Sequence, residues 1–331
     1  MDKIYEPLHI PSYQSRIFDL YFSEAKIAFF DIETTGLSPD YAKTILGGLL
    51  RPASSGAEVF QYFASDLHEE PQLLAAYLQA LSQADLLISF NGNRFDLPFL
   101  NRRAQAENLA PLPPFYTSLD LYRCCRFYSS LPQILPNLKQ KTVERFLGIA
   151  PERTDEISGA ESITLYREYQ KTKDDALRSA VLLHNRDDLV QLSRLLGIFN
   201  RLDLHRILFY EGFPVLSKKR GFYLRAIRFQ NSALTLTATA KNCPMDYNSF
   251  ENGYQASYRA AETVLTMKFP CFEQASCLFV DLESIPCDFQ ALEAYPGFQS
   301  GYLILKNKDR IQYAETNLFL KLVLQSLLQK L

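Results

Sequence analysis

The stretch IAFFDIETTGL, residues 27–37, places two acids at the end of an apolar run. Side chains two positions apart on a β-strand point to the same face, so a strand here presents Asp31 and Glu33 together while Ile32 faces away. Two ionised carboxylates side by side repel, and burying them without a cation is costly. A divalent cation bound through oxygen is the usual remedy. The pair therefore predicts a metal site that other acids complete.

A third acid follows a second apolar run. The segment LLISF, residues 86–90, reads as a strand, and NGNRFDLP, residues 91–98, follows it directly. Asp96 thus lies at a strand-to-helix turn, at the end of a sheet where sites are built. An Asp at a helix start, two positions before Pro98, is also a good N-cap. Capping and metal ligation do not exclude each other, so both interpretations stay open.

The fourth acid lies on a long predicted helix. Steps of three and four residues put one set of side chains on a single face: Leu177, Val181, His184, Asp188, Leu192, Leu195 and Phe199. His184 and Asp188 interrupt an apolar face and need partners, which a metal and a substrate-derived water can supply. Asp187 is about a hundred degrees off that face, which favours Asp188 as the ligand. Alternatively, the face ends at a crevice and both groups are solvated.

Together, four acids and a histidine suit a two-metal site. Two divalent cations at such a site activate a water and stabilise the leaving oxygen of a phosphodiester. A histidine with a near-neutral pKa, here His184, suits the role of general base toward that water. The six cysteines form no Cys-x-x-Cys pair, which disfavours a zinc site and indicates reduced thiols.

These motifs resemble the DEDD (DnaQ-like) superfamily of 3'-5' exonucleases, which have an RNase H-like fold. The resemblance covers residues 26–200 and is closest to the YprB-like branch, through residues 30–37, 91–98, 142–149 and 184–188. It implies that Asp31, Glu33, Asp96 and Asp188 bind two divalent cations, Mg or Mn, with Asp31 bridging both.

The same resemblance implies substrate contacts and exposes one departure. Thr34, Leu37, Asn91 and Phe95 are expected at the substrate, with Thr34 and Leu37 beside the terminal nucleotide. In the superfamily, a tyrosine branch has three residues between base and acid, and a histidine branch has four. Here His184 occupies the tyrosine-type spacing before Asp188, so the identity of the general base stays open.

The pattern of apolar residues predicts two domains after an irregular lead-in at residues 1–25. Residues 26–212 are expected to form the RNase H-like domain, an α/β mixed sheet flanked by helices, and 213–331 a smaller β-rich domain. The expected strands are 27–30, 44–50, 58–63, 85–90, 222–229, 233–240, 254–269, 277–282 and 302–313. The expected helices are 71–83, 97–107, 138–147, 163–170, 174–201 and 317–331.

Composition excludes some classes of protein. With 47% hydrophobic residues, 22% charged residues and a net charge of −2, the 331-residue chain is neither disordered nor a polycationic nucleic-acid binder. A signal segment and a membrane span are both absent from the sequence pattern, so we expect a cytoplasmic protein. The expected partner is nucleic acid, in single-stranded form, without a membrane; no protein partner is inferable.

Several further groups of residues carry patterns with more than one interpretation. FVDLE, residues 279–283, repeats the strand-then-Asp-x-Glu pattern but lacks the later motifs, so a solvent-facing pair is expected there. Asp120 is expected to be structural. Basic residues mixed with aromatics recur at 123–128 with Lys139 and Lys141, and again at 218–228, where they either bind phosphates and bases or are solvated.

Three functions are consistent with these motifs. The first is a metal-dependent 3'-5' exonuclease acting on single-stranded or frayed DNA or RNA. The second is a structure-selective endonuclease on the same fold. The third is a non-catalytic nucleic-acid-binding scaffold, although members that have lost activity usually lack one or more of the four acids, all of which are present here.

Overall fold

The chain forms two compact units in the computed structural model, which describes residues 1–155, 157–251 and 253–330. The first unit comprises residues 1–15 and 26–202, and the second comprises residues 16–25 together with the chain from Asp203 onward. The division comes earlier than the predicted boundary after residue 212. Helix α9 (Leu204–Glu211) is the reason, because it packs on strand β8 (Arg220–Gln230) and helix α10 (Tyr313–Lys330) of the second unit.

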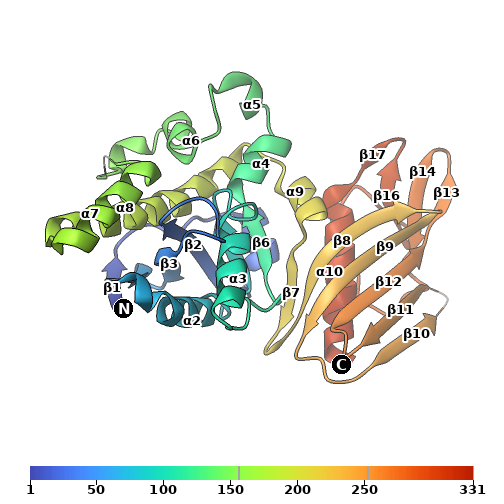
Figure 1. Cartoon of the computed structure of the whole chain (residues 1–331). Helices are drawn as coiled ribbons and strands as arrows, with labels where there is room; N and C mark the ends of the chain where they lie inside the picture. Colours follow the sequence, from blue (N-terminus) through green and yellow to red (C-terminus); the bar gives the residue numbers. More distant parts are fainter. Residues whose placement is uncertain (156, 252, 331) are drawn as a thin grey trace. The chain divides into compact units, whose positions relative to one another are not determined.

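A six-stranded mixed sheet is the centre of the first unit (Figure 1), which confirms the predicted fold class. The strands β2 (Ile27–Thr34), β5 (Leu86–Ser89) and β6 (Thr117–Asp120) run parallel, and the remaining neighbours are antiparallel. The order across the sheet is β1 (Asp2–Leu8), β4 (Gly56–Phe63), β3 (Thr44–Ala53), β2, β5, β6. Strand β2, which carries the acid pair, is therefore interior.

The expected irregular lead-in at residues 1–25 is wrong. Strand β1 pairs with β4, and helix α1 (Arg16–Phe22) belongs to the second unit. Strand β1 is the outermost strand of the sheet among the residues that the structure describes, a position where Pro7 is tolerated. Its sequence DKIYEPL carries charges between its apolar residues, so the pattern on which a strand prediction rests is weak.

Two adjacent glycines show how helices cover both faces of this sheet. A Cβ atom at Gly47 would lie 2.7 Å from the ring of Tyr77 on α2 (Glu70–Leu81), and one at Gly48 would lie 2.1 Å from Oδ1 of Asn185 on α8 (Asp175–Arg194). Consecutive residues of a strand face opposite sides. Helices α2 and α8 therefore pack on opposite faces, each against backbone without an intervening side chain.

The other helices of this unit largely match the prediction. Helix α6 (Gln140–Leu147) ends at Gly148, whose φ of 76° is left-handed, as expected of a glycine stop. The predicted helix 174–201 consists of α8 followed by a 3-10 segment, Leu195–Asn200, and the predicted helix 163–170 begins earlier, as α7 (Gly159–Thr172). The remaining helical segments are η1 (Leu67–Glu69), α3 (Asp96–Ala106), α4 (Leu121–Phe127), α5 (Leu131–Ile134) and η2 (Ala150–Glu152).

The second unit is rich in β-structure, as predicted. One antiparallel sheet has the order β10 (Tyr247–Glu251), β11 (Tyr254–Arg259), β12 (Val264–Pro270), β9 (Ala233–Lys241), β8, β7 (Pro214–Ser217). The other contains β13 (Phe272–Gln274), β14 (Cys277–Asp281), β16 (Tyr302–Asn307) and β15 (Phe298–Gln299), with β17 (Arg310–Ile311) beside β16; a short 3-10 segment, η4 (Gln290–Leu292), completes this unit.

Two predicted strands of this unit are each split by a turn. The range 254–269 is a hairpin of β11 and β12, and the range 302–313 is β16 and β17 followed by the start of α10. Thr263 and Lys308, both in left-handed conformation, lie at these turns, where the apolar pattern alone does not show a reversal of the chain.

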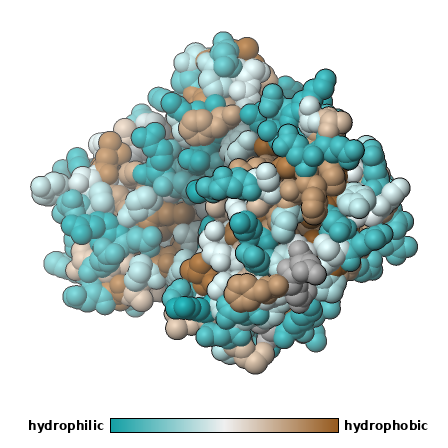
Figure 2. Space-filling model, turned by 90° about the vertical axis from the view of Figure 1, so that its right-hand side faces the viewer, coloured by the Kyte–Doolittle hydropathy of each residue, from teal (hydrophilic) through white to brown (hydrophobic). Residues whose placement is uncertain are grey.

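Figure 2 shows hydrophobic side chains gathered among hydrophilic ones on one face of the molecule. The exposed apolar residues of the second unit include Phe250, Phe272 and Tyr302.

The cysteines agree with the sequence prediction of free thiols. All six are unpaired with one another, and four of them are buried. Among the helices of the described residues, none is both long and apolar enough to cross a membrane.

Candidate active site

The five residues predicted to carry the chemistry line one open cavity of ≈ 920 Å³. Asp31 and Glu33 come from β2, Asp96 is the first residue of α3, and His184 and Asp188 come from α8. As predicted, Ile32 faces the opposite side, where it joins the apolar core beneath α2. Three segments far apart in sequence thus deliver four carboxylates and one imidazole to the same place.

Asp31 is held by neighbours on both sides of the sheet. Its Oδ2 accepts a hydrogen bond from Nδ2 of Asn185 at 2.8 Å, and its backbone oxygen accepts one from the Tyr77 hydroxyl at 3.2 Å. Burial raises the pKa of Asp31 well above its usual value, and the charges of Asp96, Asp188 and Glu33 raise it further. The carboxyl is oriented, but as an anion it lacks a compensating cation among these contacts.

The structure excludes the N-cap interpretation of Asp96, and its role as a metal ligand stays a prediction. The N-cap position of α3 is Phe95, and Asp96 lies inside the first turn, so Asp96 is not the N-cap. Its Oδ1 instead accepts a hydrogen bond from the backbone nitrogen of Ile32 at 3.1 Å, which fixes it against β2. Burial raises the pKa of Asp96 to about 7. Its carboxyl therefore faces the acid pair rather than the helix end.

Glu33, His184 and Asp188 form the tightest part of the site. One ligand atom from each lies within 4.8 Å of the other two. The Nε2 of His184 is 3.6 Å from Oε1 of Glu33 and 3.5 Å from Oδ2 of Asp188. Burial raises the pKa of Glu33 to about 7 against the opposing effect of His184, and burial also raises the pKa of Asp188.

This donor set fits divalent cations that prefer oxygen ligands. Four carboxyl groups crowd one cavity, and burial raises the pKa of each. Deprotonated carboxylates so placed repel, and bound cations would relieve both the repulsion and the cost of burial. Mg and Mn are suited to carboxylate oxygen, and the imidazole of His184 does not conflict with Mn.

Helix α8 directs its two adjacent aspartates to different places, as its geometry predicts. Asp188 lines the cavity, and its Oδ1 also pairs with Nη2 of Arg153 at 2.6 Å. Asp187 is buried elsewhere and accepts hydrogen bonds from the backbone nitrogens of Thr154 and Asp155 at 2.6 and 2.8 Å. Asp188 therefore lies in the cavity and Asp187 does not, while the role of Asp188 as a metal ligand stays a prediction.

The four residues expected at the substrate all line the cavity. Leu37 is 82% exposed, while Thr34 is buried and its hydroxyl donates to the Gly36 carbonyl at 2.7 Å. Asn91 has a left-handed φ of 69°, and Phe95 packs on Phe99 with ring centroids 5.5 Å apart. Leu37 is the side chain of this group most available to a ligand.

Asp120 has the structural role expected of it. Its carboxylate accepts hydrogen bonds from the backbone nitrogens of Asn91 and Asn93 at 2.8 and 3.2 Å, and from those of Tyr122 and Arg123. It thereby caps α4 and fixes the loop that leads to Asp96.

The first group of basic and aromatic residues divides into two parts. Lys139 and Lys141 line the cavity, together with Arg145. Arg123 and Arg126 instead lie over the ring of Phe127, with centroid distances of 5.3 and 5.6 Å. The second group, residues 218–228, belongs to the β-rich unit, mostly on β8, and its role remains a prediction.

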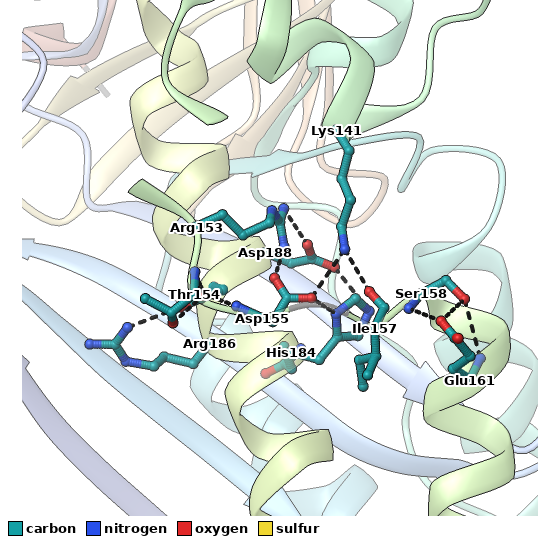
Figure 3. A network of polar contacts seen from close by, with 12 residues as sticks. Lys141, Arg153, Thr154, Asp155, Ile157, Ser158, Glu161, His184, Arg186 and Asp188 are labelled. Carbon is teal, nitrogen blue, oxygen red and sulfur yellow. Dashed lines mark hydrogen bonds and ion pairs between the residues drawn. The ribbon is translucent and has the colours of Figure 1, made fainter. Parts of the chain in front are cut away.

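Sequence reasoning missed the residues that surround the five. Asp155 binds His184, and Arg153 joins Asp155 to Asp188 (Figure 3). Asn185 binds Asp31, and Arg153 also pairs with the buried Glu144. Asn185 follows His184 directly, so helical geometry could have placed it near the site. Arg153 and Asp155 lie between η2 and α7, outside any periodic pattern, and no spacing signal marks them.

An α/β unit with a mixed sheet and acids delivered by β2, α3 and α8 to one cavity defines a protein of the RNase H-like class. A family model described as the RNase H superfamily matches residues 28–200, more than half of the chain. The chain belongs to the RNase H superfamily.

Comparison with other proteins adds three partial likenesses. No curated protein matches the chain in sequence. A family B DNA polymerase of the hyperthermophilic archaeon Pyrobaculum calidifontis is 20% identical, with a TM-score of 0.41 over 52% of this chain and 24% of that chain. A structure of exonuclease I is 14% identical, with a TM-score of 0.33 over 65% and 55%.

Escherichia coli exonuclease I in complex with a dT13 oligonucleotide is 14% identical, with a TM-score of 0.30 over 64% of this chain and 55% of that chain. This chain thus spans between about a quarter and just over half of the length of these proteins.

Proposed function

We propose that this protein is a two-metal-ion 3'-5' exonuclease of the DEDD type, closest to the YprB-like branch, acting on the ends of single-stranded or frayed DNA or RNA. The observation that carries the proposal is the convergence of Asp31, Glu33, Asp96 and Asp188 on one cavity beside His184. Separate segments bring these groups together, and burial raises the pKa of each of the four carboxyl groups. Perturbed pKa values of this kind are typical of functional sites.

In this proposal the four carboxylates would hold two divalent cations, Mg or Mn, with Asp31 as the ligand common to both. Bound there, the cations would polarise the phosphodiester and lower the pKa of an attacking water. His184 would take the proton of that water through Nε2, which faces Glu33 and Asp188. Asn185 holds Asp31 in orientation, and the buried Asp96 is fixed by the backbone of β2.

The cavity wall supplies the features that an unpaired strand end requires. Leu37 and Phe95 offer apolar surface for the terminal nucleotide, and Lys139 and Arg145 offer positive charge for its phosphates. The directionality of the proposed reaction and the YprB-like assignment rest on the motif resemblance, and the fold supports only the broader class.

The test uses the purified full chain and single-stranded oligonucleotides labelled at either end, with Mg or Mn. The proposal expects a ladder that shortens from the 3' end and that disappears in Asp31→Asn. Internal cuts in branched or looped substrates would replace it with the endonuclease alternative. If no oligonucleotide is shortened and Mn binds equally to wild type and Asp31→Asn, the protein is a scaffold and the proposal is wrong.

A further inference from the structure

The two ring nitrogens of His184 face different partners (Figure 3). Nδ1 lies 2.7 Å from Oδ2 of Asp155, while Nε2 faces Glu33 and Asp188 at 3.6 and 3.5 Å. Both His184 and Asp155 are buried. Because the two nitrogens of a neutral imidazole differ in whether they carry the proton, the partner of Nδ1 decides what Nε2 can do.

Two positively charged side chains, Arg153 and Lys141, keep Asp155 ionised as a carboxylate. Nη1 of Arg153 lies 2.5 Å from its Oδ1, and Nζ of Lys141 lies 3.1 Å from its Oδ2. Burial acts to raise the pKa of Asp155, but the hydrogen bonds and charges of His184, Arg153 and Lys141 outweigh it and hold that pKa well below its usual range. An ionised carboxylate only accepts hydrogen bonds. The proton between the two residues therefore belongs to Nδ1 of His184.

The segment that carries Asp155 is fixed at two further points. Arg153 forms a two-pronged ion pair with the buried Glu144, at 3.0 and 2.6 Å. Asp187 accepts hydrogen bonds from the backbone nitrogens of Thr154 and Asp155 and from the Thr154 hydroxyl. Helix α8 thus anchors, through Asp187, the same segment that orients its own His184. This arrangement locates Asp155 by backbone and side chain together.

We propose that Asp155 is a positioning residue, which keeps the proton of His184 on Nδ1 and leaves the lone pair of Nε2 directed at Glu33 and Asp188. This inference rests on the proposed function for its catalytic consequence, but not for the tautomer itself. A carboxylate that binds the second nitrogen of a histidine fixes both its tautomer and the orientation of its ring. Asp155 thereby gives His184 a defined orientation, although the three-residue spacing between His184 and Asp188 is one at which the family usually has tyrosine.

The first test reads the tautomer directly, in metal-free protein without substrate. Two-dimensional ¹⁵N NMR of the imidazole nitrogens, at a pH where the ring is neutral, resolves the tautomers, and the chain has only four histidines to assign. His184→Gln identifies the signal. We expect the Nδ1–H form in wild type and in Glu161→Gln, and a shift toward the Nε2–H form in Asp155→Asn. An Nε2–H form in wild type, or an unchanged form in Asp155→Asn, overturns the inference.

Glu161 is a matched control because it is an exposed acid of the following helix, α7. Its carboxylate accepts hydrogen bonds from Ser158 in a capping box, a role that glutamine also fills, and it makes none with His184. Circular dichroism and thermal unfolding of both variants separate a local tautomer change from loss of the fold.

The second test measures the consequence for the proposed reaction. We expect Asp155→Asn to lower kcat by about 10²-fold or more, with KM and the Mn dissociation constant unchanged. Loss of Mn affinity in parallel with kcat would make Asp155 a support of the metal site and overturn the positioning role. An inactive wild type would refute the proposed function alone, since the tautomer measurement needs neither metal nor substrate.

Discussion

Two strands of this chain carry the same pattern of an aromatic residue, one apolar residue, Asp, an apolar residue and Glu, and they have different outcomes. Asp31 and Glu33 lie within β2, which continues to Thr34. Asp281 is the last residue of β14, and Glu283 lies beyond its end. The Oδ1 of Asp281 accepts a hydrogen bond from the backbone nitrogen of Glu283 at 3.0 Å, and Glu283 is exposed. Alternation aligns two acids only while the strand continues.

The cross-strand neighbours of the two pairs also differ. Opposite Asp31 stands Gly48, and opposite Asp281 stands Tyr302. The glycine leaves room for Asn185 to reach Asp31, whereas Tyr302 shares with Asp281 the lining of an aromatic hollow on its own sheet. A strand-end acid pair therefore becomes part of a site only where the neighbouring strand admits a helix that brings further groups.

The largest expected effect separates the two pairs by activity. Asp31→Asn is expected to reduce the proposed nuclease activity by about 10²–10³-fold or more, because it removes the carboxylate proposed to lie between the cations. Asp281→Asn, the matched change in the β-rich unit, is expected to retain wild-type activity. Initial rates on a labelled single strand with Mn, together with Mn titration calorimetry, measure both. Equal losses of activity in the two variants would contradict the assignment of the chemistry to Asp31 rather than Asp281.

The second prediction concerns the stability of the metal-free protein against pH. The pKa of Glu33 is raised to about 7, mainly by burial, so its contribution to stability is complete below its unfolded value and is lost as pH rises through about 7. Glu33 alone should therefore lower the free energy of unfolding of wild type by on the order of 2–3 kcal/mol between about pH 5 and pH 8, and the raised pKa values of Asp31, Asp96 and Asp188 add to this decline.

Urea unfolding in the presence of a chelator tests this comparison. Glu33→Gln should make the decline shallower, because a neutral amide does not ionise while Asp31, Asp96 and Asp188 still do, and Glu283→Gln should follow wild type. Added Mn should restore stability to wild type at the higher pH, since it binds the folded state. A decline in Glu33→Gln as steep as in wild type would show that Glu33 does not contribute to it.

Most of the site was predictable because it lies on periodic elements. Asp31 and Glu33 follow from strand alternation, and Asp188 rather than Asp187 follows from helical geometry. Asp96 was located but its contact was not, because the bond from Ile32 joins two segments that the sequence does not relate. Asp155 and Arg153 could not be predicted, since their positions depend on Asp187 and Glu144 holding an irregular segment.

The fold was predictable to a similar degree and for the same reason. The four interior strands of the mixed sheet were found, β2, β3 and β5 from apolar runs and β4 from alternation, whereas the short edge strand β6, with the sequence TSLD, was not. Edge strand β1 was not found either, because charged residues interrupt its pattern, and the hairpin of β11 and β12 was read as one strand because residues 260–263 carry no glycine or proline. The second unit draws α1 from residues 16–25, a long-range association with no local signal.

A third prediction tests the room that glycine provides beside Asp31. Gly48→Ala is expected to destabilise the protein by about 1–3 kcal/mol, because its Cβ would lie 2.1 Å from Oδ1 of Asn185 and must displace that side chain. Mn affinity should fall with it, since Asn185 orients Asp31. Urea unfolding and calorimetry measure the two effects.

Gly197→Ala is the control for this change. A Cβ at Gly197, in the 3-10 segment after α8, meets no atom within 4 Å, so the change should be neutral or slightly stabilising. If Gly48→Ala were equally well tolerated, the close approach of α8 at Gly48 would not be what allows Asn185 to reach Asp31.

The smallest expected effect compares basic residues of the two units. Lys139 is exposed and lines the cavity, whereas Lys141 is engaged with Asp155 and the Ile157 carbonyl. Lys139→Ala should raise KM for a single strand by roughly 2–5-fold without changing kcat, because it removes one phosphate contact, and should reduce the salt dependence of binding by about one charge.

Lys218→Ala, in the turn between β7 and β8, is the counterpart in the β-rich unit. If the substrate is held by the unit that carries the acids, this change leaves KM and the salt dependence at wild-type values. A larger effect of Lys218→Ala would assign the strand-binding role to the residues 218–228 instead. Asp31 and Glu33 would then supply the chemistry, while the unit that carries Asp281 and Glu283 would supply the affinity for the strand. The two units would share one function despite the different fates of their similar acid pairs.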